Sequence, residues 1–160
     1  MSFASENKDK ELFDLKRQID TCMRKAMDEL LEDTMSQKMD ASQVEWIIRL
    51  LEETINRLNN LTPSRKDLHS ELKGRVDLDL IRQMMIHEAI EENDVTFLVN
   101  TFYDRIQMLC APSQDSSIEK EKKICLEQKS ISGKICFLLS KTNKNIDDIQ
   151  ELLKRFNNSQ

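Results

Sequence analysis

The stretch VDLDLIRQMMIHEAIEENDVTFLVNTFYDRIQMLCAP, residues 76–112, is the most apolar part of an otherwise polar chain. At about 100° per residue, the first half of the stretch places apolar side chains over more than half of a helix circumference. An arc that wide predicts a helix with contacts on several sides. The polar side chains Asp79, Gln83 and His87 form the narrow strip that remains. The apolar members are Leu78, Leu80, Ile81, Met84, Met85, Ile86 and Ala89.

The second half of the stretch predicts another helix, because its apolar side chains recur at helical spacing on one face. These side chains are Val95, Leu98, Val99, Phe102, Ile106 and Leu109. Phe97 and Met108 lie on the opposite side and predict a second contact. Asp94 is the predicted N-cap, and Pro112 limits how far the helix continues. The two helices together predict a hairpin at the centre of the core.

Arg82 falls inside the apolar arc of the first helix. A buried charge without a partner is costly. We therefore expect Arg82 to pair with a carboxylate, either Asp79 one turn earlier or one on another helix.

The composition favours helices throughout the chain. Among its 160 residues only two are Gly and two are Pro, whereas Leu, Met, Glu, Lys and Gln are abundant. A chain of this length fits one domain with one sizeable core. The sequence thus predicts an all-α, single-domain bundle of about seven or eight helices. A flexible N-terminus (residues 1–7) precedes the helical domain, which covers residues 8–160.

The first predicted helix runs from about Lys8 to Lys38, with a break near Asp33–Ser36 left open. Its apolar positions alternate three and four residues apart, similar to the seam of a coiled coil. Oligomerisation through this helix is therefore an alternative function, that of a structural module. The positions are Leu12, Leu15, Ile19, Cys22, Met23, Ala26, Met27, Leu30 and Leu31.

Two boundary signals lie before the central stretch. Asp40 and Ser42 are alternative N-caps of the second helix, and Ser42 has Glu45 at capping-box spacing. The pair Thr62-Pro63 predicts the start of a short helix that ends near Gly74.

Beyond Pro112 the sequence becomes more polar. Ser116 and Glu119 again have capping-box spacing. Breaks between helices are predicted at Ser130–Gly133 and Thr142–Asn145.

Charge and compartment signals indicate an intracellular protein. The net charge of −5 argues against nucleic acid as the main partner. No apolar run approaches the ~18 residues of a membrane span, and residues 1–11 lack the apolar core of a signal peptide. We therefore expect a cytoplasmic protein with free thiols at all four cysteines, which are Cys22, Cys110, Cys125 and Cys136.

The search for catalytic chemistry favours a non-enzymatic interaction module. His69 and His87 have no ligand partners at metal-site spacing, and two glycines cannot build a phosphate loop. We predict no catalytic residue, no cofactor and no metal site. The enzymatic alternative is a site in which Cys110 or His87 works with carboxylates; we expect Cys110 to be packed and its thiol inert.

Trp46 lies off the apolar stripe of the second helix. Burial against another helix is its simpler interpretation. Aromatic residues and arginine are, however, enriched where partners bind. Trp46 and Arg49 are therefore the candidate partner contact.

The central stretch also resembles a known family. The run Val76–Gln83, the His87-x-Ala89 pair and the sequence LCAP at Leu109–Pro112, followed by Asp115, are similar to the conserved segment of the T-complex protein 11 family. The resemblance covers about residues 42–115, and the helices in residues 116–157 diverge from it. The matching positions are Asp79, Leu80, Ile81, Arg82, Gln83, His87, Ala89, Leu109, Cys110, Ala111 and Pro112.

The resemblance implies an all-helical, non-enzymatic adaptor that modulates signalling linked to cyclic AMP and protein kinase A through protein–protein binding. It brings no catalytic residues. We interpret the matching positions as structural: Leu80 and Ile81 pack, Arg82 pairs with a carboxylate, and Cys110-Ala111-Pro112 ends a helix. The protein partner and the oligomeric state are left open.

Overall fold

The structure is a computed structural model that describes residues 41–158 continuously, together with single helical positions between Lys8 and Lys25. The predicted flexible terminus and the Asp40 cap lie outside the described residues. The predicted first helix is described only at those single positions.

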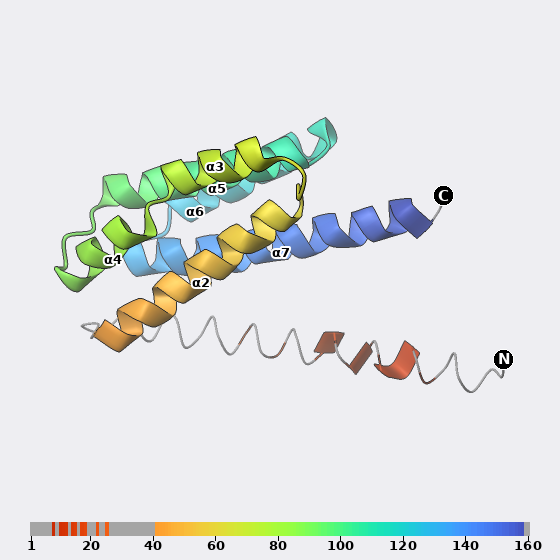
Figure 1. Ribbon diagram of the computed structural model, residues 1–160, viewed down its shortest axis with the longest axis horizontal. Coiled ribbons are helices and arrows are strands. Elements are labelled where there is room, and N and C mark those ends of the chain that lie inside the picture. The colour runs from red at the N-terminus through yellow and green to blue at the C-terminus, as the bar shows by residue number, and fades with distance from the viewer. Residues whose placement is uncertain are drawn as a thin grey trace.

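Residues 41–158 form an all-α bundle, as predicted (Figure 1). Within this range there are six α-helices, a short 3₁₀ turn at Pro112–Gln114 and no strand, which makes fewer helices than the predicted seven or eight. The helices are α2 (Ala41–Asn60), α3 (Lys66–Arg75), α4 (Leu78–Ile86), α5 (Glu92–Leu109), α6 (Asp115–Leu126) and α7 (Ile131–Asn158).

The core lies between α2, α5 and α7. α5 packs against both α6 and α7, while α2 packs against α4 and α7. The predicted apolar stripes of α2 and α5 point into this core, since the spacing of both matches the helical period. The buried side chains of these stripes are Val44, Ile47, Ile48, Leu51, Ile55 and Leu58 on α2, and Val95, Leu98, Val99, Phe102 and Ile106 on α5.

The predicted central hairpin is wrong for its first helix. α4 packs chiefly on α2, and Met85 is its only fully buried side chain. Leu80 and Ile86 remain 54% and 43% exposed because no described helix covers the outer side of α4. The predicted second contact of α5 is also wrong, since Phe97 and Met108 are half-exposed.

Four of the predicted helix starts are displaced. Asp94 is the third residue of α5 rather than its cap, and its carboxylate accepts the backbone N–H of Glu91 at 2.9 Å. Ser42 and Ser116 lie inside α2 and α6, because those helices begin at Ala41 and Asp115. Thr62-Pro63 belongs to a turn, and α3 begins only at Lys66.

The predicted break at Thr142–Asn145 does not exist, and α7 continues through it. Asn143 donates to the Leu139 carbonyl at 2.8 Å and to Thr54 Oγ1 of α2 at 3.0 Å. Asn145 donates to Glu121 of α6 at 2.8 Å. Each of these side chains thus binds a side chain of a neighbouring helix, and the further bond of Asn143 to the Leu139 carbonyl stays within the unbroken α7. The other predicted break is nearly right, because α7 begins at Ile131.

Candidate functional site: the outward face of α4

One side of α4 faces solvent over its whole length. Leu80, Gln83, Ile86 and His87 are exposed, and so is Asp79. At 3.6 residues per turn these five positions share an arc of about 120°. Leu80 and Ile86 lie at its two edges, with the polar strip of Asp79, Gln83 and His87 between them. We call this surface the α4 face.

The beginning of α4 is fixed by its cap and by an ion-pair bridge. The Asp77 carboxylate accepts the backbone N–H of Leu80 at 3.1 Å. Arg82 Nε lies 2.5 Å from Glu45 Oε1 on α2, and Arg82 Nη1 donates to Asp79 Oδ1 at 2.7 Å. The hydrogen bond to Glu45 raises the pKa of Arg82. The structure thus confirms that Arg82 pairs with carboxylates, although its side chain is 29% exposed rather than enclosed in the core.

The other end of α4 is closed by a Schellman motif. His87 is the C-cap, and Glu88 adopts a left-handed conformation with φ of 54°. The backbone N–H of Glu88 donates to the Met85 carbonyl at 3.2 Å, and that of Ala89 donates to the Met84 carbonyl at 2.7 Å. The His87-x-Ala89 pair is therefore a helix stop, and both residues are exposed.

The second part of the family-like motif ends α5, as predicted. Cys110 is the C-cap, and its N–H donates to the Ile106 carbonyl at 3.1 Å. Ala111 is extended, with ψ of 147°, because it precedes Pro112. The two parts of the motif are not brought together: α4 lies near the beginning of α5, whose 18 residues extend about 27 Å to Cys110 (Figure 1).

Trp46 is half-buried against the core, and Arg49 is exposed. Both belong to α2, and Trp46 follows directly after Glu45, the partner of Arg82. The contact of Trp46 and Arg49 with a partner stays a prediction.

The thiols and histidines do not assemble into a reactive site in the described part of the chain. His87 and Cys110 belong to the two separated parts of the motif. Burial raises the pKa of Cys110, and burial together with Glu121 raises the pKa of Cys125 to about 12. Both shifts favour the unreactive thiol form. No disulfide joins these cysteines in the structure. Among the described residues no three His, Cys, Asp or Glu side chains gather at metal-binding distance.

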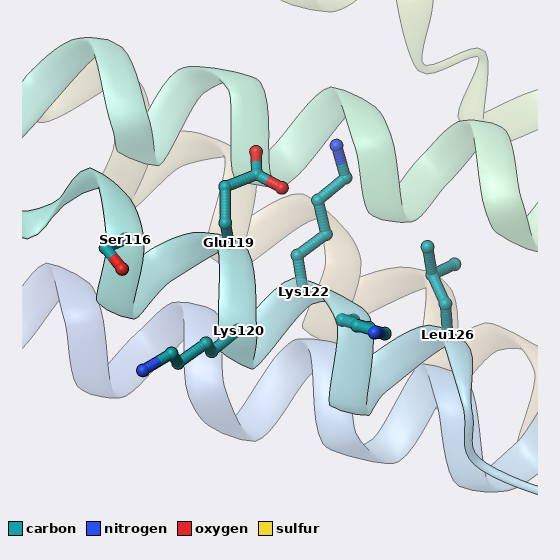
Figure 2. A pocket seen from close by; sticks show the side chains of 6 residues that line it. Ser116, Glu119, Lys120, Lys122 and Leu126 are labelled. Atoms are coloured by element: carbon teal, nitrogen blue, oxygen red, sulfur yellow. The ribbon is translucent and has the colours of Figure 1, made fainter.

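The outer side of α6 carries a shallow hollow of about 430 Å³ (Figure 2). The described residues lining it all belong to α6 and mix both charges: Ser116, Glu119, Lys120, Lys122, Lys123 and Leu126. Glu119 points toward α5, where it accepts a hydrogen bond from Gln107 at 2.8 Å, whereas Lys120 points away (Figure 2). The polar groups therefore do not converge on one point.

None of the helices among the described residues is both long and apolar enough to cross a bilayer.

No solved structure matches the chain. The family model described as T-complex protein 11 matches residues 2–156, a wider match than the predicted 42–115 and one that includes the helices thought to diverge. The chain belongs to the T-complex protein 11 family.

Proposed function

We propose that the protein is a non-enzymatic helical adaptor that binds a protein partner through the α4 face. The observation that supports this most is the exposure of Leu80 and Ile86 on a helix that is otherwise well fixed. In a complex, Leu80 and Ile86 would be buried against the partner. The polar strip between them would form hydrogen bonds that fix the partner's orientation. Packing does not account for Leu80, Gln83 and His87, which are among the residues that carry the family resemblance.

The α4 face is prepared for binding by its fixed backbone. The Asp77 cap holds one end of α4, the Schellman motif at Glu88 holds the other, and Arg82 ties the middle to Glu45. A surface that is ordered before binding loses little conformational entropy in the complex. Helix faces of this kind suit the apolar side of an amphipathic helix in a partner.

The partner, we further propose, acts in signalling linked to cyclic AMP and protein kinase A, in the cytoplasm. This step is supported by membership of the T-complex protein 11 family and by what the family resemblance implies. In this proposal the T-complex protein 11 family member itself contributes no catalytic group, in keeping with the raised pKa of its Cys110 thiol.

A photo-crosslinking amino acid in place of Leu80 tests the proposal in extracts of the native cell. We expect a covalent adduct with one main protein, which mass spectrometry identifies. The matched control carries the same photo-crosslinker in place of Lys120, an exposed residue of α6 that points away from α5. Equal labelling from both positions, or no adduct from position 80, contradicts the proposed site. A partner outside the cyclic-AMP pathway contradicts only the signalling part.

A structural module that oligomerises through the predicted first helix is the second candidate. Leu12 and Leu15 favour it, since both are exposed at the described helical positions. Sedimentation at several concentrations separates the two: this candidate requires a dimer or larger species, and the adaptor does not.

A further inference from the structure

Negative charge is concentrated at α4 and the beginning of α5. Residues 76–94 hold six carboxylates and one arginine, which gives a formal net charge of −5 with histidine neutral. Residues 41–75 and 95–158 together hold sixteen Lys or Arg and thirteen Asp or Glu, a net charge of +3. We call residues 76–94 the acidic segment. Its carboxylates belong to Asp77, Asp79, Glu88, Glu91, Glu92 and Asp94.

These carboxylates lie toward both ends of the α4 face. Asp77 caps the beginning of α4, and Asp79 lies in its first turn. Glu91 is the N-cap of α5, four residues after His87 ends α4. α4 is about 14 Å long, and its exposed apolar side chains, Leu80 and Ile86, lie between the two acidic ends.

The ion pairs of the acidic segment do not remove its excess of negative charge. Arg82 binds Asp79 of the segment and also Glu45 of α2, which brings one more carboxylate to this surface. Lys134 of α7 pairs with Glu92 and supplies one positive charge. These two additions cancel, so the excess stays the same.

The acidic end near His87 is not needed to stabilise α4. A cation is the charge that the C-terminal end of a helix dipole favours, yet the last turn of α4 has no basic residue. Glu92 and Asp94 are favoured by the dipole of α5, because they lie in its first turn. The dipole of α4 and the carboxylates of α5 thus add to one negative potential beside His87. A cation from a partner would be attracted to both.

We propose that the segment bound by the α4 face is a basic amphipathic helix of the partner protein. Its apolar side chains would contact Leu80 and Ile86, and its Lys or Arg side chains would lie over the carboxylates at the two ends of α4. The inference rests on the proposed function of the α4 face. Complementary charge speeds association and excludes partners of like charge. The same negative potential disfavours nucleic acid and anionic lipid at this surface.

The dimensions of α4 set the length of the bound helix. Leu80 and Ile86 are six residues apart, or about 9 Å along the axis, so the apolar contacts of the partner should lie about two turns apart. A helix of ~14 residues is ~21 Å long and extends beyond both ends of α4. It can therefore place a cation at each end.

Two synthetic helical peptides of ~14 residues test the proposal on the full chain. Both carry leucine on one face, while the other face carries lysine in one peptide and glutamate in the other. We expect the leucine–lysine peptide to bind at least about tenfold more tightly at low ionic strength, and the difference to shrink as salt screens the charges. Fluorescence anisotropy of labelled peptides measures each Kd.

Charge-removing variants locate the binding site. Asp77→Asn/Glu91→Gln removes one carboxylate at each end of α4, and asparagine keeps the N-cap because its side-chain oxygen also accepts the Leu80 N–H. This variant should bind the leucine–lysine peptide several-fold more weakly. The matched control, Glu127→Gln/Asp148→Asn, removes the same charge at exposed positions after α6 and on α7, and it should bind normally.

Equal affinity for the two peptides would overturn the proposal, and so would binding of neither. Equal weakening by the charge variant and its control would overturn it too, because net charge alone would then explain the affinity. A leucine–lysine peptide that binds Leu80→Ser/Ile86→Ser as tightly as the wild type would show that it binds elsewhere. Crosslinking from position 80 judges the proposed function separately: a partner captured there through a segment without Lys or Arg contradicts this inference and leaves the adaptor in place.

Discussion

Arg82 of α4 and Glu45 of α2, 37 residues apart in sequence, form an ion pair with Nε 2.5 Å from Oε1. The same guanidinium also binds Asp79 of its own helix. Arg82, which belongs to the family-like motif, thus links α4 to α2. The apolar edges of the α4 face, Leu80 and Ile86, remain exposed to solvent. Arg82 therefore helps to hold α4 on α2 in this orientation.

Removing this bridge should lower stability modestly. Arg82→Met loses two ion pairs that are partly exposed, and such pairs contribute little and are screened by salt. We expect a lower urea midpoint at low ionic strength and a smaller difference at high ionic strength. Glu45→Gln should have less effect in the Arg82→Met background than in the wild type. Strictly additive effects in this double-mutant cycle would show that the pair does not couple the two helices.

Glu88→Gly should relieve about 0.5–1 kcal/mol of backbone strain, which offsets the loss of the Glu88 side chain. Glu88 has φ of 54°, a conformation that costs an L-residue energy and that glycine adopts freely. The control is Glu53→Gly in the middle of α2, where glycine should instead cost about 1 kcal/mol. Chemical denaturation measures both, and two losses of similar size would contradict the Schellman assignment.

Two phenylalanines of α5 should differ sharply in their contribution to stability. Phe102 is fully buried, and Phe102→Ala should cost about 3–5 kcal/mol. Phe97 is half-exposed, and Phe97→Ala should change stability by no more than about 0.5 kcal/mol. Denaturant titration of the two variants tests which face of α5 is covered. Similar losses would mean that Phe97 is also packed.

The apolar period predicted the stripes of α2 and α5 correctly because each of these helices has one side in the core. The same period failed for α4. A wide apolar arc shows how much surface a helix could bury, but not which neighbours cover it. The arc therefore predicts that Leu80 and Ile86 are buried, whereas both are exposed and form the edges of the α4 face.

Most of the other differences between prediction and structure involve hydrogen-bond or ion-pair partners that are far apart in the sequence. Asn143 lies in a run of poor helix formers, yet its partner Thr54 is 89 residues away and on another helix. The spacing of Ser42 and Glu45 predicts a capping box, whereas Glu45 forms an ion pair with Arg82. Sequence correctly predicted that Arg82 needs a carboxylate, because that need is local. The choice between carboxylates depends on how α2 and α4 pack.

The buried thiol of Cys125 should make stability depend on pH in the alkaline range. Burial raises its pKa from 9.0 to about 12 in the folded protein. Between these values the unfolded chain releases the proton and the folded one keeps it, so stability falls as pH rises. The stability advantage of the wild type over Cys125→Ala should therefore be largest near pH 8 and smaller at pH 10–11. Urea midpoints of both proteins measure this, and a constant difference would contradict the raised pKa.

The most direct test of the central claim is partner binding by a variant of the α4 face. Leu80→Ser/Ile86→Ser removes both apolar edges at positions that are already exposed, so its circular-dichroism spectrum and its urea midpoint should stay close to those of the wild type. We predict that its affinity for the partner identified by crosslinking at position 80 falls at least about tenfold, a loss of about 1.4 kcal/mol. Phe97→Ser, at a similarly exposed position of α5, is the matched control and should bind normally. Wild-type affinity in a correctly folded Leu80→Ser/Ile86→Ser variant would contradict the account.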